Sequence, residues 1–238
     1  MGAMPFHAVA RAPLTGISSM ATRQLLAELT MAYAQHSGQA VNIASVGGVD
    51  AAKRVQARER FDVVVLASDA IAKLITEGHL RADSRVDLVH SGVAVAVRSG
   101  SPQPDIASED AVRQAVLAAS TLSYSTGPSG VALARLFDQW GITREVQNRI
   151  VTAPPGVPVG SLVASGEVEL GFQQLSELIH MEGITIVGSL PSAIQITTTF
   201  SGAIATACTR VADVRALLDF MASPETAAAK MRQGMQPA

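Results

Sequence analysis

The segment from Val41 to Ala70, VNIASVGGVDAAKRVQARERFDVVVLASDA, constrains the fold of this chain more than any other segment. It opens with a short extended run, breaks at Gly47-Gly48, continues in a helical pattern, and ends in an unbroken apolar run from Phe61 to Ala67. Strand, glycine turn, helix and strand in this order form a βαβ unit, whose parallel strands are buried on both faces and are therefore continuously apolar. The pattern predicts a parallel α/β sheet.

The ends of these strands predict one wall of a ligand site. Ligands of such sheets bind beyond the carboxyl ends of the strands, where helix N-termini present free N–H groups. Gly47, Gly48 and Ser68 follow the two strands at such positions. We therefore expect all three residues to contact a ligand.

The N-terminal part of the chain is expected to supply the opening strand of the same sheet. Phe6 to Ala10 is short and apolar, Arg11 to Gly16 contains proline and glycine, and Met20 to His36 carries a helical apolar stripe. These patterns predict a strand, a turn and a helix, with Ser18 or Ser19 as the N-cap.

A second set of strands and helices follows a polar, proline-containing segment from Ser99 to Asp105. Alternating strands and helices in two similar halves predict an α/β protein with two lobes. We expect residues 1–95 and 199–238 to form lobe 1 and residues 96–198 to form lobe 2.

Composition excludes several classes of protein. The 238 residues are 48% hydrophobic, but no apolar run reaches the roughly 18 residues of a membrane-spanning helix. A net charge of −2 and a pI near 6.2 give no electrostatic footprint for nucleic acid. A single cysteine, Cys208, excludes an internal disulfide, and the 5 histidines lack the spacing of metal ligands, so we expect neither a metal nor a cofactor.

The first residues lack the basic and apolar regions of a signal peptide. The sequence leaves open whether the chain is cytoplasmic or the mature form of an exported protein.

Four stretches resemble, in order and spacing, the molybdate-binding family of periplasmic solute-binding proteins. They are FDVVVLASD from Phe61, Pro128-Ser129-Gly130, GEVELGF from Gly166, and the helix pair around Leu217 to Glu225. The resemblance covers nearly the whole chain and implies the type II fold, in which two α/β lobes close on a small anion in the cleft between them.

The family holds its oxyanion with two serine hydroxyls of the first lobe, backbone N–H groups, and a tyrosine of the second lobe. By resemblance, the serine positions are occupied here by Pro13 and Gly48, and the tyrosine position by Gln174. The resemblance also implies a backbone cradle, formed by Gly47, Gly48, Ser129, Gly130 and Val157.

Arg11 is expected at the mouth of this site, directly after the predicted first strand. A guanidinium is a planar fork suited to a carboxylate, so Arg11 favours an organic acid over a metal oxyanion. The alternative is that Arg11 points to solvent and pairs with a surface carboxylate. Ser68, Gln173 and Gln174 are candidates for further hydrogen bonds to the ligand.

An enzyme would need a proton acceptor at the cleft. Tyr124 and Ser125 end a strand of the second lobe, and Asp69 ends a strand of the first, although Asp69 is also well placed to cap a helix. The sequence does not single out one base.

Our leading hypothesis from the sequence is a protein that binds a di- or tricarboxylate between two lobes, with a membrane permease as its partner if it is exported. The alternative is a cofactor-free isomerase, because bacterial aconitate isomerases resemble the same fold and move a double bond by proton transfer. Binding of molybdate or tungstate ranks third.

Overall fold

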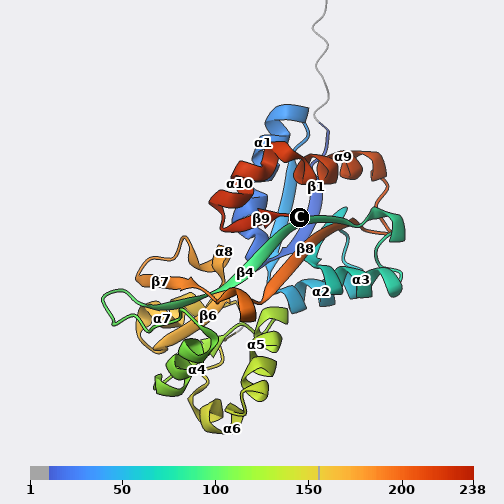
Figure 1. Ribbon diagram of the computed structural model, residues 1–238. Coiled ribbons are helices and arrows are strands. Elements are labelled where there is room, and N and C mark those ends of the chain that lie inside the picture. The colour runs from blue at the N-terminus through green and yellow to red at the C-terminus, as the bar shows by residue number, and fades with distance from the viewer. Residues whose placement is uncertain (1–10, 155) are drawn as a thin grey trace, which may run out of the picture.

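The computed structural model describes residues 11–154 and 156–238, which form two α/β lobes joined by long strands (Figure 1). In Figure 1, β1 and β8 lie in the upper lobe beneath α1 and α9, and β6 and β7 lie in the lower lobe with α4 to α7. The strand order is β2-β1-β3-β8-β4-β6-β5, with β7 and β9 also paired to β4.

The predicted βαβ unit is present. It consists of β2 (Val41–Val46), α2 (Gly48–Gln56) and β3 (Val63–Ala67). β1 (Leu14–Ser19) lies between β2 and β3 and is parallel to both. All five residues of β3 are buried, as its unbroken apolar run predicted.

The first described strand differs from the prediction. Phe6 to Ala10 lies outside the described residues, and Leu14 to Gly16, predicted as part of a turn, belong to β1. A Cβ on Gly16 would lie 2.7 Å from a Val63 methyl, so glycine here permits close packing of neighbouring strands and does not form a turn. The predicted turn is therefore wrong from Leu14 onward.

Helices cover lobe 1 on both faces. The predicted helix after β1 begins as a 3-10 turn, η1 (Met20–Thr22), and continues as α1 (Arg23–Ser37). The other helices of this lobe are α3 (Ser68–Thr76), α9 (Val211–Ala222) and α10 (Ala227–Arg232), with short 3-10 turns η2 (Ala82–Ser84) and η5 (Pro224–Thr226).

The 13-residue strand β4 (Val86–Arg98) takes part in both lobes. Its first half pairs with β8 (Thr197–Ile204) and β9 (Met235–Pro237), and its second half pairs with β6 (Leu170–Gln174) and β7 (Ile184–Ser189).

Lobe 2 contains β5 (Leu122–Tyr124), which is parallel to β6. Its helices are α4 (Glu109–Ala118), α5 (Pro128–Gln139), α6 (Thr143–Val146), α7 (Val159–Ser165) and α8 (Leu175–Leu178), with 3-10 turns η3 (Gln147–Arg149) and η4 (Ser192–Ile194). Among the described residues, no helix has the length and apolar character needed to span a bilayer.

The buried apolar residues form separate cores. The largest includes residues from 14 to 89 and from 200 to 235, and the second includes residues from 93 to 190. These cores support our division of the chain at 95/96 and 198/199, which we keep as a proposal.

Candidate functional site

The parallel register of lobe 1 brings three strand ends to one edge of the sheet. Ser19 of β1 lies opposite Val46 of β2, and Ser18 lies opposite Val65 of β3. The residues that follow these strands, Gly47-Gly48 and Ser68, therefore gather at the same edge as Ser19. We call this group the lobe 1 edge.

The N-termini of α2 and α3 lie at this edge, and their N-cap residues, Gly47 and Ala67, provide no side-chain cap. The first helical hydrogen bond of α2 runs from Ala51 N to Gly47 O, so the preceding N–H groups lack an intrahelical acceptor. Such N–H groups, together with the positive end of the helix dipole, favour an anion.

Ser19 is a polar residue of this edge that the sequence did not single out as a candidate. It is 7% exposed, and its Oγ has no hydrogen-bond partner among the described residues, whereas the neighbouring Ser18 Oγ lies 2.8 Å from Ser45 Oγ. A Cβ on Gly48 would lie 3.6 Å from Ser19 Cβ, so the hydroxyl lies beside the start of α2. Ser19, and not Pro13, is the residue that ends the opening strand.

The structure places Arg11 and Pro13 away from this edge. Both precede the amino end of β1, which at about 3.3 Å per residue lies roughly 17 Å from its carboxyl end. The Arg11 side chain is 73% exposed, and its Nη1 lies 3.7 Å from Asp213 Oδ1. Arg11 thus follows the alternative of a surface ion pair. Pro13 likewise lies at the amino end of β1, away from the lobe 1 edge.

Asp69 forms a hydrogen bond at the start of its own helix, as expected if it acts as a helix cap. It lies exposed in the first turn of α3, where its Oδ1 accepts from the Ala70 N–H at 2.8 Å. This local contact satisfies one of the N–H groups in the first turn of α3.

In lobe 2, the end of β5 and the start of α5 form a compact turn. Ser125 Oγ and Ser129 Oγ are 2.9 Å apart, and a Cβ on Gly130 would lie 1.5 Å from Ser125 O, so only glycine fits at that position. Tyr124 is half-buried with its ring edge-on to Phe137, and burial raises the pKa of its phenol, which is therefore neutral.

Gln174 joins lobe 2 to the strands that connect the lobes. Its side chain is buried. The amide oxygen accepts a hydrogen bond from Thr198 Oγ1 at 2.9 Å, and in this orientation the amide nitrogen donates to Ser91 O at 3.1 Å. Val157, the last expected backbone donor, gives its N–H to Pro154 O at 3.0 Å. Both predicted contacts thus already have partners within the protein.

Glu177 is a second residue that sequence reasoning missed. It lies on α8, directly after β6, and its Oε2 accepts from Gln173 Nε2 at 2.8 Å, while Gln173 Oε1 accepts from Gly160 N at 3.1 Å. Burial raises the pKa of the Glu177 carboxyl to about 7. We call this set of residues, with Ser125 and Ser129, the lobe 2 edge, because the parallel strands β5 and β6 end together.

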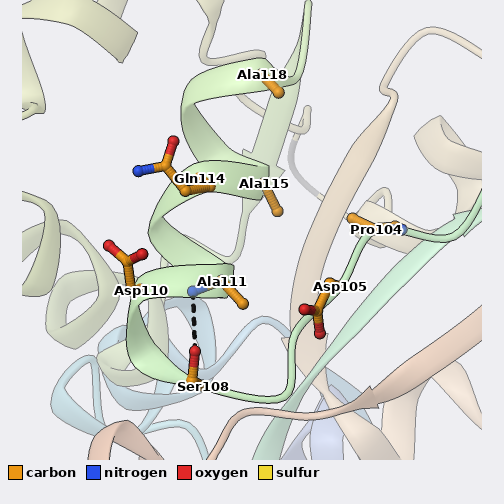
Figure 2. Close-up of a pocket in the computed structure, with 8 residues that line it drawn as sticks. All are labelled: Pro104, Asp105, Ser108, Asp110, Ala111, Gln114, Ala115 and Ala118. Atoms are coloured by element: carbon orange, nitrogen blue, oxygen red, sulfur yellow. Dashed lines mark hydrogen bonds between the residues drawn. The ribbon is translucent and has the colours of Figure 1, made fainter.

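The two edges meet where α8 contacts η1. Within residues 11–154 and 156–238, no group of three or more metal-binding side chains occurs. A hollow against α4 lies elsewhere in lobe 2 and contains none of the predicted site residues (Figure 2). It is an open surface feature, beside the Ser108 hydroxyl that caps Ala111 N.

The arrangement of two α/β lobes with polar groups at facing strand ends agrees with comparisons to known proteins. Residues 14–236 match the family model of bacterial extracellular solute-binding proteins. The chain belongs to this family. It is 39% identical over 230 residues to an aconitate isomerase of Pseudomonas sp., an alignment that covers 94% of this chain and 87% of that protein.

Solved structures confirm the predicted type II fold. The periplasmic molybdate-binding protein of Azotobacter vinelandii superposes with a TM-score of 0.77 at 21% identity, covering 93% of this chain and 98% of that one. The sulfate-binding protein SubI of Mycobacterium tuberculosis superposes with a TM-score of 0.79 at 17% identity, covering 96% and 88%. At these identities the likeness concerns the fold alone.

Proposed function

We propose that this protein is a cofactor-free isomerase that moves the double bond of an unsaturated tricarboxylate of the aconitate type. The observation that carries the proposal is the 39% identity to an aconitate isomerase over 94% of this chain. Sequence reasoning ranked this activity behind simple binding, and the extent of the match reverses that order.

The lobe 1 edge supports binding of such a substrate. Ser19 Oγ is a buried hydroxyl without a partner in the described chain, and two helices whose N-cap residues provide no side-chain cap begin at the same edge, at Gly48 and Ser68. Hydrogen-bond donors that are already in place stabilise the negative charge of carboxylates without reorganisation. Closure of the lobes would bring the lobe 2 edge onto the same ligand.

The reaction needs no group beyond the protein. A base removes a proton from the methylene carbon next to the double bond, the double bond shifts, and the proton returns to the former vinyl carbon. The charge that develops spreads onto carboxylate oxygens, where N–H and O–H donors stabilise it.

A second candidate is binding of a small organic anion without turnover, with a membrane permease as partner. The match of residues 14–236 to a solute-binding family favours it. Both candidates use the same strand ends, so binding alone cannot separate them.

The proposed activity is tested by incubating the purified protein with trans-aconitate and separately with cis-aconitate, and quantifying both isomers by chromatography. A thermal-shift screen with citrate, both aconitates, molybdate and tungstate runs in parallel, since a ligand at 100 times its Kd stabilises by about 2.7 kcal/mol. We expect the same mixture of isomers from either starting compound.

If a carboxylate stabilises the protein but no isomer forms, the isomerase proposal is wrong and the second candidate, a protein that binds an organic anion without turnover, takes its place. Stabilisation by molybdate or tungstate alone would contradict both carboxylate candidates. Arg11→Ala is a matched control and should retain full activity, because Arg11 lies near the opposite end of β1.

A further inference from the structure

We propose that Glu177 is the acid–base group that removes and returns the proton in this isomerisation. The inference rests on the proposed function and adds to it the residue that performs its chemistry. Glu177 follows the β6 strand and lies on α8, the element of lobe 2 that contacts η1 of lobe 1. It therefore lies where the two edges meet.

Hydrogen bonds fix one side of the Glu177 carboxyl. Gln173 Nε2 donates to its Oε2 at 2.8 Å, and Gln173 is itself held by the Gly160 N–H at 3.1 Å. Glu177 Oε1 accepts no hydrogen bond from the residues that the structure describes. An oriented carboxyl with one oxygen available is the geometry that a general base requires.

The environment keeps this carboxyl close to half-ionised at neutral pH. Burial is the larger influence and raises its pKa to about 7, and the Gln173 hydrogen bond acts in the opposite direction. A general acid–base group is most effective when its pKa lies near the working pH, because the same group must both accept and donate the proton.

No nearby charge accounts for this behaviour. Neither β6, η1 nor α7 contains an ionisable residue, and α8 contains Glu177 alone. The ionisable residues of β4 and of the segment after α8 do not contribute to the Glu177 pKa; they are Asp87, His90, Arg98, His180 and Glu182.

The other candidate bases meet these requirements less well. Asp69 is exposed and contacts the start of its own helix, and burial keeps the Tyr124 phenol neutral. Glu177 combines partial burial, a fixed orientation and a place between the lobes.

The step is balanced without a co-reactant. Glu177 carboxylate takes a proton from the methylene carbon, and the C–H electron pair forms the new double bond. The electrons of the old double bond pass to the far carbon and its carboxylate, and the protonated Glu177 returns the proton to that carbon. The enzyme ends in its starting state.

The test compares Glu177→Gln with Glu167→Gln, an exposed glutamate of the same lobe, in the isomerisation assay. We expect Glu177→Gln to lower kcat by at least about 100-fold, the range of a lost general base, while aconitate still raises its melting temperature. Glu167→Gln should be unchanged. If Glu177→Gln keeps kcat within threefold of the wild type, the inference is wrong.

The pH profile gives a second test that does not depend on the variant folding. For the wild type, kcat/KM should rise with pH through an apparent pKa of about 7, because the free enzyme must be ionised to accept the proton. In the wild type the hydrogen bond from Gln173 lowers the pKa of Glu177. Gln173→Leu removes this bond, so the rise of kcat/KM should move to higher pH. A profile without a limb in this region overturns the role of Glu177, whereas a wild type that forms no isomer overturns the proposed function itself.

Discussion

The two edges that face the predicted ligand differ in how far their polar groups are already satisfied. At the lobe 1 edge, Ser19 Oγ has no partner in the described residues, and two helices start at N-cap residues that provide no side-chain cap. At the lobe 2 edge, side chains bond to one another, in the Ser125–Ser129 pair and in the contact of Gln173 with Glu177. A buried polar group without a partner costs free energy, so an edge that keeps one is suited to a ligand that supplies it.

This difference separates two tasks. We infer that lobe 1 supplies open donors for carboxylates, and that lobe 2 supplies a rigid support that orients an acid–base group. The variants below test this division, from the largest expected effect to the smallest.

Gly130→Ala should affect the lobe 2 edge most strongly. Its Cβ would lie 1.5 Å from Ser125 O, a backbone atom that cannot move aside without displacing the start of α5. We expect a loss of at least about 3 kcal/mol in the free energy of unfolding, measured by urea denaturation. The control is Gly127→Ala, since nothing lies within 4 Å of a Cβ there and its φ is −85°. Equal stability of the two variants would show that the turn is not rigid.

Glu177 should make stability depend on pH in lobe 2. Its pKa rises from 4.5 in the unfolded chain to about 7 in the fold, so the unfolded state releases the proton more readily. The free energy of unfolding should therefore fall as pH rises from about 4.5 to about 7, by about 2 kcal/mol after allowing for partial exposure.

Glu177→Gln should remove this dependence, and Glu167→Gln should keep it. The measurement is denaturant unfolding of the three proteins at a series of pH values. Parallel curves for the wild type and Glu177→Gln would contradict the raised pKa.

Ser19→Ala and Ser18→Ala form a matched pair in lobe 1. Ser19→Ala should weaken binding of aconitate by about tenfold, the value of one hydrogen bond, and leave the stability of the free protein unchanged or slightly higher, because the buried hydroxyl has no partner there. Ser18→Ala should show the reverse, losing about 1 kcal/mol of stability because its bond to Ser45 is lost, with binding retained. Calorimetric titration and denaturation measure the two quantities, and equal behaviour of the variants would remove Ser19 from the site.

Lys230→Met should have the smallest effect. Lys230 is 1% exposed in α10 of lobe 1, burial lowers its pKa, and none of the described residues forms an ion pair with it. Replacing a buried charge by an apolar side chain of similar length should leave stability unchanged or raise it by about 1 kcal/mol. Lys73→Met, at an exposed position, is the control. A large loss of melting temperature for Lys230→Met would indicate a partner for the ammonium group.

Local patterns in the sequence were sufficient to predict the fold. The apolar run from Phe61 to Ala67 and the glycine pair at Gly47-Gly48 are properties of consecutive residues, and the βαβ unit follows from them. Gly16 misled the prediction because its role depends on Val63 of another strand, which no local pattern records.

The site was harder to predict for the same reason. An opening strand predicted too early put Pro13 and Arg11 in the place of Ser19. Glu177 gave no signal at all, because its environment depends on Gln173 and on Gly160 of another helix. The distribution of partnered and unpartnered polar groups exists only in the folded chain.

The most direct test of the proposed isomerase is proton NMR of trans-aconitate with the protein in D2O. We expect cis-aconitate to accumulate. If the proton on Glu177 exchanges with the solvent before it returns to the substrate, the methylene group of the product will contain deuterium. An unchanged spectrum under conditions in which trans-aconitate raises the melting temperature would contradict isomerisation and identify the protein as a carrier of the anion.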